Sequence, residues 1–158
     1  MSKDSLAFEQ TLALADLAAT DALGARIAAG LRVGDAVALE GDLGAGKTTL
    51  ARAILVALGV TEDVPSPTFT LVQEYETARL PVRHYDLYRI ENPSEMEELG
   101  LDEALDEGAA LIEWPERAIA WLPVDRLHVA LRLTDGARRA KITGPARWAA
   151  AMTDTNHA

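Results

Sequence analysis

The 158-residue chain contains no cysteine, has few aromatic residues (5%) and carries fewer basic than acidic side chains. Without cysteine, it has no disulfide bridges, thiolate metal ligands or cysteine nucleophiles. No apolar run approaches the roughly 20 residues of a membrane-spanning helix, and Glu9, Gln10 and Asp16 interrupt the segment where a signal peptide would have its apolar core. Hydrophobic residues still make up 49%, which is typical of a folded domain. We therefore expect one cytoplasmic domain over residues 1–152 that neither spans nor binds a membrane.

Acidic residues outnumber basic ones by 25 to 15, which gives a formal net charge of −10. The excess lies in one segment, because residues 91–116 hold ten acids and no base, whereas 15 acids balance 15 bases elsewhere. A surface of this sign repels the phosphate backbone of a nucleic acid, so direct, tight binding to one is not expected. The segment either docks a basic protein partner or forms a solvated helix face, and the sequence leaves both interpretations open.

Apolar spacing, together with the positions of glycine and proline, predicts strands that alternate with helices. Helices are expected over 20–31 and 47–58, and strands over 36–40, 70–75, 82–87 and 109–113. Short acidic helices are expected over 95–106 with a break at Gly100, followed by a hairpin of 126–133 and 138–143. A last helix follows Gly144 and gives way to a disordered tail over 153–158. This alternation indicates an α/β fold.

The strongest motif is the stretch G-D-L-G-A-G-K-T at 41–48, a complete match to the phosphate-loop pattern G-x-x-x-x-G-K-[ST]. Its glycines let backbone N–H groups face phosphate oxygens, and the helix that follows adds the positive end of its dipole. In such a loop Lys47 contacts the β- and γ-phosphates and Thr48 ligates Mg²⁺. Thr49 is placed to reach the α-phosphate. A chance match is the alternative, but the strand before the loop and the helix after it favour nucleotide binding.

A phosphate loop needs a further carboxylate near the metal, and two acids compete for this role. Glu113 closes the apolar run 109–113 and is the better candidate for an Mg²⁺ ligand, the alternative being a glutamate that faces solvent. Asp86, within H-Y-D-L-Y-R, suits water activation or an outer position around the metal. Thr68, in S-P-T, either senses the γ-phosphate or belongs to a plain proline-stiffened connection. His84 is interpreted as a packed or hydrogen-bonded core residue rather than a catalyst.

Missing motifs narrow the class of nucleotide-binding protein. The asparagines stand at positions 92 and 156, so the N-K-x-D motif of guanine specificity is absent, and so is the L-S-G-G-Q motif of transporter ATPases. A small-molecule kinase of similar size remains an alternative and would need an arginine-rich lid, for which Arg83, Arg89 and Arg117 are available. A scaffold that binds ATP without hydrolysing it is a third possibility.

Four segments resemble, in order and spacing, the motifs of the TsaE family (older name YjeE): G-D-L-G-A-G-K-T-T at 41–49, S-P-T-F-T at 66–70, H-x-D-L-Y-R at 84–89 and E-W-P at 113–115. The match spans about residues 20–121. The resemblance implies a three-layer α/β fold of the P-loop NTPase type, with a mostly parallel central sheet and an antiparallel hairpin portion. It also implies an ATPase, weak alone and dependent on partners, that is required for N6-threonylcarbamoyladenosine in tRNAs reading codons that begin with adenine.

The family resemblance also implies partners, cofactors and residue roles. Such an ATPase acts on ATP and Mg²⁺ with the TsaD and TsaB proteins and meets tRNA only indirectly, through that complex. The phosphate-binding residues carry over to Gly44, Ala45, Gly46, Lys47, Thr48 and Thr49. The metal ligands carry over to Thr48 and Glu113, and the catalytic set to Lys47, Thr68, Asp86 and Glu113. Leu17 or Thr20 for the adenine, and Arg138 or Arg139 near the nucleotide, rest on pattern alone.

Overall fold

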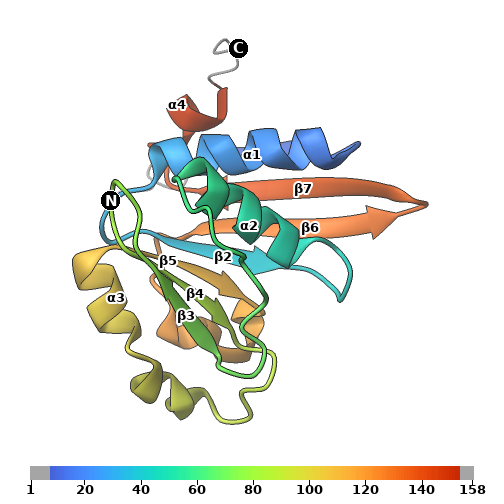
Figure 1. The fold of residues 1–158 in the computed structure, drawn as a ribbon. Helices are drawn as coiled ribbons and strands as arrows, with labels where there is room; N and C mark the ends of the chain where they lie inside the picture. Colours follow the sequence, from blue (N-terminus) through green and yellow to red (C-terminus); the bar gives the residue numbers. More distant parts are fainter. Residues whose placement is uncertain (1–7, 154–158) are drawn as a thin grey trace.

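The sheet of the protein has seven strands in the order β1-β7-β6-β2-β5-β4-β3 (Figure 1). The computed structural model describes residues 8–153. Its strands are β1 (Phe8–Ala13), β2 (Ala36–Glu40), β3 (Val72–Tyr75), β4 (Val82–Asp86), β5 (Ala109–Glu113), β6 (Leu127–Thr134) and β7 (Ala137–Gly144). The four central strands, β6, β2, β5 and β4, are parallel to one another, whereas β3, β7 and β1 pair antiparallel at the two sides. This confirms a parallel central sheet with an antiparallel hairpin, β6–β7.

Helices cover both faces of the sheet and complete three layers (Figure 1). On one face lie α1 (Leu17–Gly30), α2 (Lys47–Ala57) and α4 (Trp148–Thr153), which share one apolar core with the sheet. A second core lies between the opposite face and α3 (Leu101–Glu107), with the 3₁₀ helices η2 (Pro93–Leu99) and η3 (Pro115–Trp121). The predicted three-layer α/β fold is therefore confirmed, and residues 8–153 contain no helix long and apolar enough to cross a membrane.

Helix α1 begins three residues before the predicted start, because Asp16 caps it. The Asp16 side chain accepts a hydrogen bond from the backbone N–H of Ala19 at 2.9 Å, which satisfies one of the free donors of the first turn. Gly24 then brings α1 directly onto α2, since a Cβ at this position would lie 2.5 Å from the Cβ of Ala53. This close approach fixes α2, and with it the residues that begin it, against the sheet.

Strand β1 and the 3₁₀ helix η3 were not predicted from the sequence. In β1 the even-numbered residues from Phe8 are more buried than their neighbours, so the alternation in F-E-Q-T-L-A is the signal that could have identified it. The predicted break at Gly100 is confirmed, with a left-handed φ of 66° between η2 and α3. Of the predicted tail over 153–158, all but Thr153, the last residue of α4, lies outside the described residues.

Candidate nucleotide-binding site

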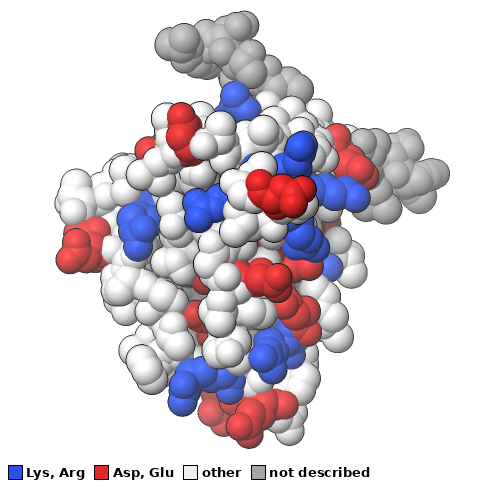
Figure 2. Space-filling model, turned by 90° about the vertical axis from the view of Figure 1, so that its right-hand side faces the viewer, with Lys and Arg blue, Asp and Glu red and all other residues white. Residues whose placement is uncertain are grey.

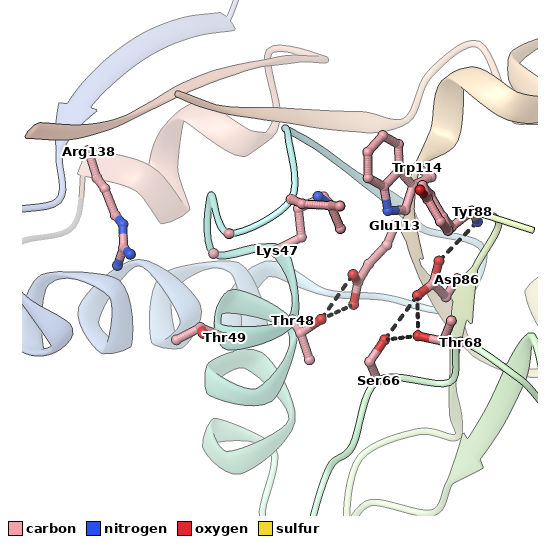
Figure 3. Close-up of a pocket in the computed structure, with 13 residues that line it drawn as sticks. Lys47, Thr48, Thr49, Ser66, Thr68, Asp86, Tyr88, Glu113, Trp114 and Arg138 are labelled. Carbon is pink, nitrogen blue, oxygen red and sulfur yellow. Dashed lines mark hydrogen bonds between the residues drawn. The ribbon is translucent and has the colours of Figure 1, made fainter. Parts of the chain in front are cut away.

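The loop between β2 and α2 opens onto a pocket of about 400 Å³ at the carboxyl end of the parallel strands (Figure 3). This end of an open α/β sheet is where ligands usually bind. The pocket brings together most of the candidate site residues: Gly44, Gly46, Lys47, Thr48, Thr49, Thr68, Asp86 and Glu113. Ala45 does not line it, because its methyl group is buried in the apolar core beneath the loop.

Two glycines shape the loop. Gly44 and Gly46 have φ values of 82° and 111°, in the left-handed region that side chains with a Cβ rarely adopt. A Cβ at either position would meet nothing within 4 Å, so the backbone conformation, not the available space, requires glycine. Gly46 is also the residue from which α2 starts, so the free N–H groups of the first helical turn face the pocket, as anion binding requires.

Lys47 carries a buried positive charge at the floor of this loop. The residue is 5% exposed, and Nζ donates to the carbonyl oxygens of Gly41 and, at 3.0 Å, Asp42. Burial lowers the pKa of Lys47, and the nearby Glu113 carboxylate acts in the opposite direction. Both of its hydrogen-bond acceptors are neutral oxygens, so a phosphate in the pocket would give the ammonium an anionic partner.

Glu113, at the end of β5, meets the first turn of α2. The Thr48 Oγ1 lies 3.0 and 2.9 Å from its two carboxylate oxygens, and the His84 Nε2 lies 2.7 Å from Oε2. Glu113 is 2% exposed, so it is not the solvent-facing glutamate considered above. His84 is wholly buried, which agrees with its interpretation as a hydrogen-bonded core residue.

Asp86 organises the opposite wall of the pocket. Its Oδ2 accepts hydrogen bonds from the hydroxyls of Ser66 at 2.9 Å and Thr68 at 3.3 Å, and its Oδ1 accepts from the backbone N–H of Tyr88 at 3.0 Å. The Ser66 and Thr68 hydroxyls are themselves 3.0 Å apart. Both carboxylate oxygens of Asp86 thus have hydrogen-bond partners, Oδ1 keeps acceptor capacity for a further donor, and the residue ties the S-P-T loop to the end of β4 (Figure 3).

The oxygens beside the phosphate loop suit Mg²⁺. Thr48 and Glu113 offer hard oxygen ligands next to each other, and Mg²⁺ at nucleotide sites usually takes one or two protein ligands together with phosphate oxygens and water. Within residues 8–153 no group of three or more His, Asp or Glu side chains could hold a metal ion. Two protein oxygens leave the other positions around Mg²⁺ to phosphate oxygens and water, so Thr48 and Glu113 fit a metal that binds together with a nucleotide.

Four further residues, to which the sequence analysis gave no catalytic or binding role, also line the pocket: Leu43, Ser66, Tyr88 and Trp114. Trp114 adopts a left-handed φ of 59°, a strained conformation for a residue with a side chain. Its ring lies 4.2 Å from the Lys47 Nζ and 4.9 Å from the Tyr88 ring. The signal for Trp114 is its place in the E-W-P motif, directly after Glu113.

The residues suggested by pattern alone lie in different places. Arg138 lines the nucleotide pocket, whereas Arg139 does not. Leu17 lines a second hollow of about 400 Å³ between α1 and α2, and Thr49 borders both hollows. Thr20 is buried in α1 and lines neither. Of the two residues suggested for the adenine, only Leu17 is therefore accessible beside the pocket.

The fold and the loop together define an α/β domain of the P-loop NTPase type. The crystal structure of YdiB from Bacillus subtilis has the same fold, with a TM-score of 0.77 and 32% sequence identity over 92% of this chain and 93% of that one. The sequence profile of the family described as "Threonylcarbamoyl adenosine biosynthesis protein TsaE" matches residues 14–141. The chain therefore belongs to the TsaE family, as its motifs indicated.

Individual relatives agree with this assignment. The TsaE protein of Bacillus subtilis strain 168 is 44% identical over 114 residues, which cover 72% of this chain and 71% of the relative. The TsaE protein of Nostoc sp. PCC 7120 is 41% identical over 151 residues, which cover 90% of this chain and 92% of the relative. Both relatives are named as tRNA threonylcarbamoyladenosine biosynthesis proteins. The similarity extends over most of the length on both sides.

Proposed function

We propose that this chain is a cytoplasmic, magnesium-dependent ATP hydrolase that is required for N6-threonylcarbamoyladenosine in tRNAs reading codons that begin with adenine. The observation that carries the ATPase part is the contact between Thr48 and Glu113, 2.9 and 3.0 Å, beside a buried lysine and a glycine-rich loop. This contact joins the helix after the loop to a carboxylate on the neighbouring strand, as nucleotide hydrolysis with Mg²⁺ requires. The tRNA-modification part rests on family membership.

In this mechanism the loop and Lys47 hold the phosphates. The N–H groups of the first turn of α2 face the pocket, and the Lys47 ammonium can neutralise charge that develops on the β- and γ-phosphate oxygens. Thr48 and Glu113 would hold Mg²⁺, which when bound neutralises charge on the phosphates. These groups bind the triphosphate and stabilise the leaving diphosphate.

Asp86 and Thr68 are the residues proposed to act on the attacking water. When a water oxygen attacks the γ-phosphorus and the bond to the β-phosphate oxygen breaks, the water must lose a proton. The Asp86 carboxylate lines the pocket and can orient that water or accept its proton. The Thr68 hydroxyl, 3.3 Å from Asp86, can exchange this partner for a γ-phosphate oxygen, which would make the S-P-T loop sensitive to the nucleotide.

Partners enter this proposal as the TsaD and TsaB proteins, with tRNA reached only through their complex. The segment 91–116 supports an indirect role toward tRNA, since nine of its ten acids, all but the buried Glu113, are at least partly exposed and would repel a phosphate backbone. On the face shown in Figure 2, basic and acidic side chains are interspersed, which is unlike the single basic face of a nucleic-acid-binding protein.

The experiment that tests this proposal measures phosphate release from ATP by the purified chain, alone and with TsaD and TsaB. We expect slow hydrolysis alone and clear stimulation by the partners, both lost in Lys47→Met. In Glu113→Ala we expect nucleotide binding without metal to persist and magnesium-dependent hydrolysis to fall. ATP binding without partner stimulation would refute the tRNA-modification role, and a phosphorylated metabolite in place of free phosphate would instead favour the small-molecule kinase.

A further inference from the structure

His84 is a wholly buried side chain to which the mechanism above gives no task. It lies on β4, and its ring Nε2 is 2.7 Å from Oε2 of Glu113, which is itself buried. A carboxylate oxygen without a proton can only accept a hydrogen bond. The histidine therefore donates its Nε2–H to the carboxylate that we propose as a metal ligand.

The strand register explains why this residue reaches Glu113. Asp86 stands opposite Glu113 and His84 opposite Leu111 in the parallel pair β4–β5. Side chains two residues apart on a strand share a face, so His84 and Asp86 point to the same side of the sheet. Leu111 belongs to the apolar core beneath α1 and α2, which identifies this side as the one that carries the phosphate loop. His84 thus lies on the same side of the sheet as Asp86 and Glu113, which line the pocket, and two residues before Asp86 on β4.

The other ring nitrogen, Nδ1, shows that a buried histidine at this position costs free energy of folding. Within residues 8–153, the buried Nδ1 of His84 has no hydrogen-bond partner. Leaving a buried polar atom unsatisfied costs about 1–3 kcal/mol. An apolar side chain of similar shape would fill the same space without that cost. An apolar residue could not, however, donate the hydrogen bond that Nε2 of His84 donates to Glu113.

We propose that His84 is a positioning residue that sets the direction of the Glu113 carboxylate toward the metal–nucleotide complex. The inference rests on the proposed function and names a further residue of the same site. Oε2 of Glu113 already accepts from His84 and lies 2.9 Å from the Thr48 hydroxyl. Oε1, 3.0 Å from that hydroxyl, keeps more of its acceptor capacity for a metal or a metal-bound water. Partners that orient a metal ligand in this way typically contribute 10- to 100-fold in metal affinity, as an order of magnitude.

Two variants of matched chemistry separate positioning from packing. In His84→Gln the amide nitrogen can take the place of Nε2, whereas in His84→Asn the amide ends one bond short, near the place of Nδ1. The readout is the binding of Mn²⁺, as a paramagnetic substitute for Mg²⁺, measured by electron paramagnetic resonance with ADP present. We expect His84→Asn to bind Mn²⁺ roughly 10- to 100-fold more weakly and His84→Gln to recover to within about threefold of the parent.

A control measures ADP affinity in EDTA, where Glu113 has no metal to hold. We expect all three proteins to bind ADP equally there, because the loop and Lys47 are unchanged. The role of His84 would be overturned if the two variants bound Mn²⁺ with equal affinity, or if their ADP affinity in EDTA fell as much as their Mn²⁺ affinity. Either result would leave the proposed function standing. A parent protein that binds neither Mn²⁺ nor ADP would overturn the proposed function itself and, with it, this inference.

A measurement on the unsubstituted protein tests the proposal even if both variants fail to fold. Nitrogen-15 spectra of the parent protein distinguish the two ring nitrogens of a histidine. We expect His84 to carry its proton on Nε2 and its resonance to move when ADP and Mg²⁺ are added together, but not when ADP is added with EDTA. A proton found on Nδ1 alone, or an Nε2 resonance that does not respond to the metal, would overturn the proposal.

Discussion

Replacing Lys47 by methionine is expected to weaken nucleotide binding and, at the same time, to stabilise the nucleotide-free fold. The Lys47 side chain is buried, and methionine keeps most of its length while removing the charge. The two effects have opposite signs because they depend on the same ammonium. In the empty pocket the charge is costly to desolvate, whereas against a phosphate it is an attractive partner.

The loss of binding can be bounded from the hydrogen bonds of Nζ. An ammonium has three N–H donors, and two of them face the carbonyl oxygens of Gly41 and Asp42. One donor therefore remains for a phosphate oxygen without any rearrangement of the loop. A hydrogen bond between charged groups contributes about 1.5–3 kcal/mol, which corresponds to a roughly 10- to 150-fold loss of affinity in Lys47→Met. This is a lower limit, since a second phosphate contact would add to it.

The sign of the stability effect follows from the pKa of Lys47, which burial lowers. The folded state thus binds this proton more weakly than the unfolded chain does. Below the folded-state pKa the charge reduces stability in full, and the penalty fades as the pH rises toward the pKa of the unfolded chain. At neutral pH the variant should therefore melt at a higher temperature than the parent, by roughly 2–4 °C for each kcal/mol gained.

Titration with a fluorescent ADP analogue and thermal denaturation without nucleotide, both near neutral pH, check the two signs. Lys47→Arg is the matched control, because it keeps the charge and should not gain stability. If Lys47→Met instead lowered the melting temperature, the bonds of Nζ to the loop carbonyls would outweigh its desolvation, and the reasoning about the buried charge would be refuted.

Three other substitutions test separate parts of the structure. In Asp86→Asn, phosphate release in a single turnover should fall roughly 10²- to 10⁴-fold, while nucleotide affinity stays nearly unchanged. The reason is that the carboxylate is proposed to act on the attacking water and not on nucleotide binding. A parallel loss of nucleotide affinity would contradict this role. Gly24→Ala should lower the free energy of unfolding in urea by about 1–3 kcal/mol, because its Cβ would lie 2.5 Å from that of Ala53, and an unchanged midpoint would count against the close helix packing. The hydrogen bond from His128 lowers the pKa of Glu40, so Glu40→Gln should be less stable than the parent by up to about 1 kcal/mol near neutral pH. That difference should shrink as the pH falls through the folded-state pKa of Glu40, and a difference independent of pH would exclude the Glu40 charge as its cause.

Much of the fold could be predicted because its signals are local. The strands over 36–40 and 109–113 are short apolar runs and were placed at their observed bounds. The break at Gly100 follows from a residue that tolerates a left-handed φ. Strand β1 was missed because six residues of alternating burial at the edge of a sheet give a weak pattern, and such a strand depends on pairing with β7, which is far away in the sequence.

The candidate site likewise has a part that local sequence signals predict and a part that depends on contacts between distant segments. By itself the sequence determined the loop chemistry. The spaced glycines, the lysine and the two threonines all lie within residues 41–49, and their geometry follows from a turn that leads into a helix. Only the tertiary structure decided which distant groups meet that loop. The Thr48 contact with Glu113 spans 65 positions, and the His84 bond to the same carboxylate spans 29. Such contacts depend on strand order and register, which arise when the whole sheet packs against its helices and leave no periodic trace in any one segment.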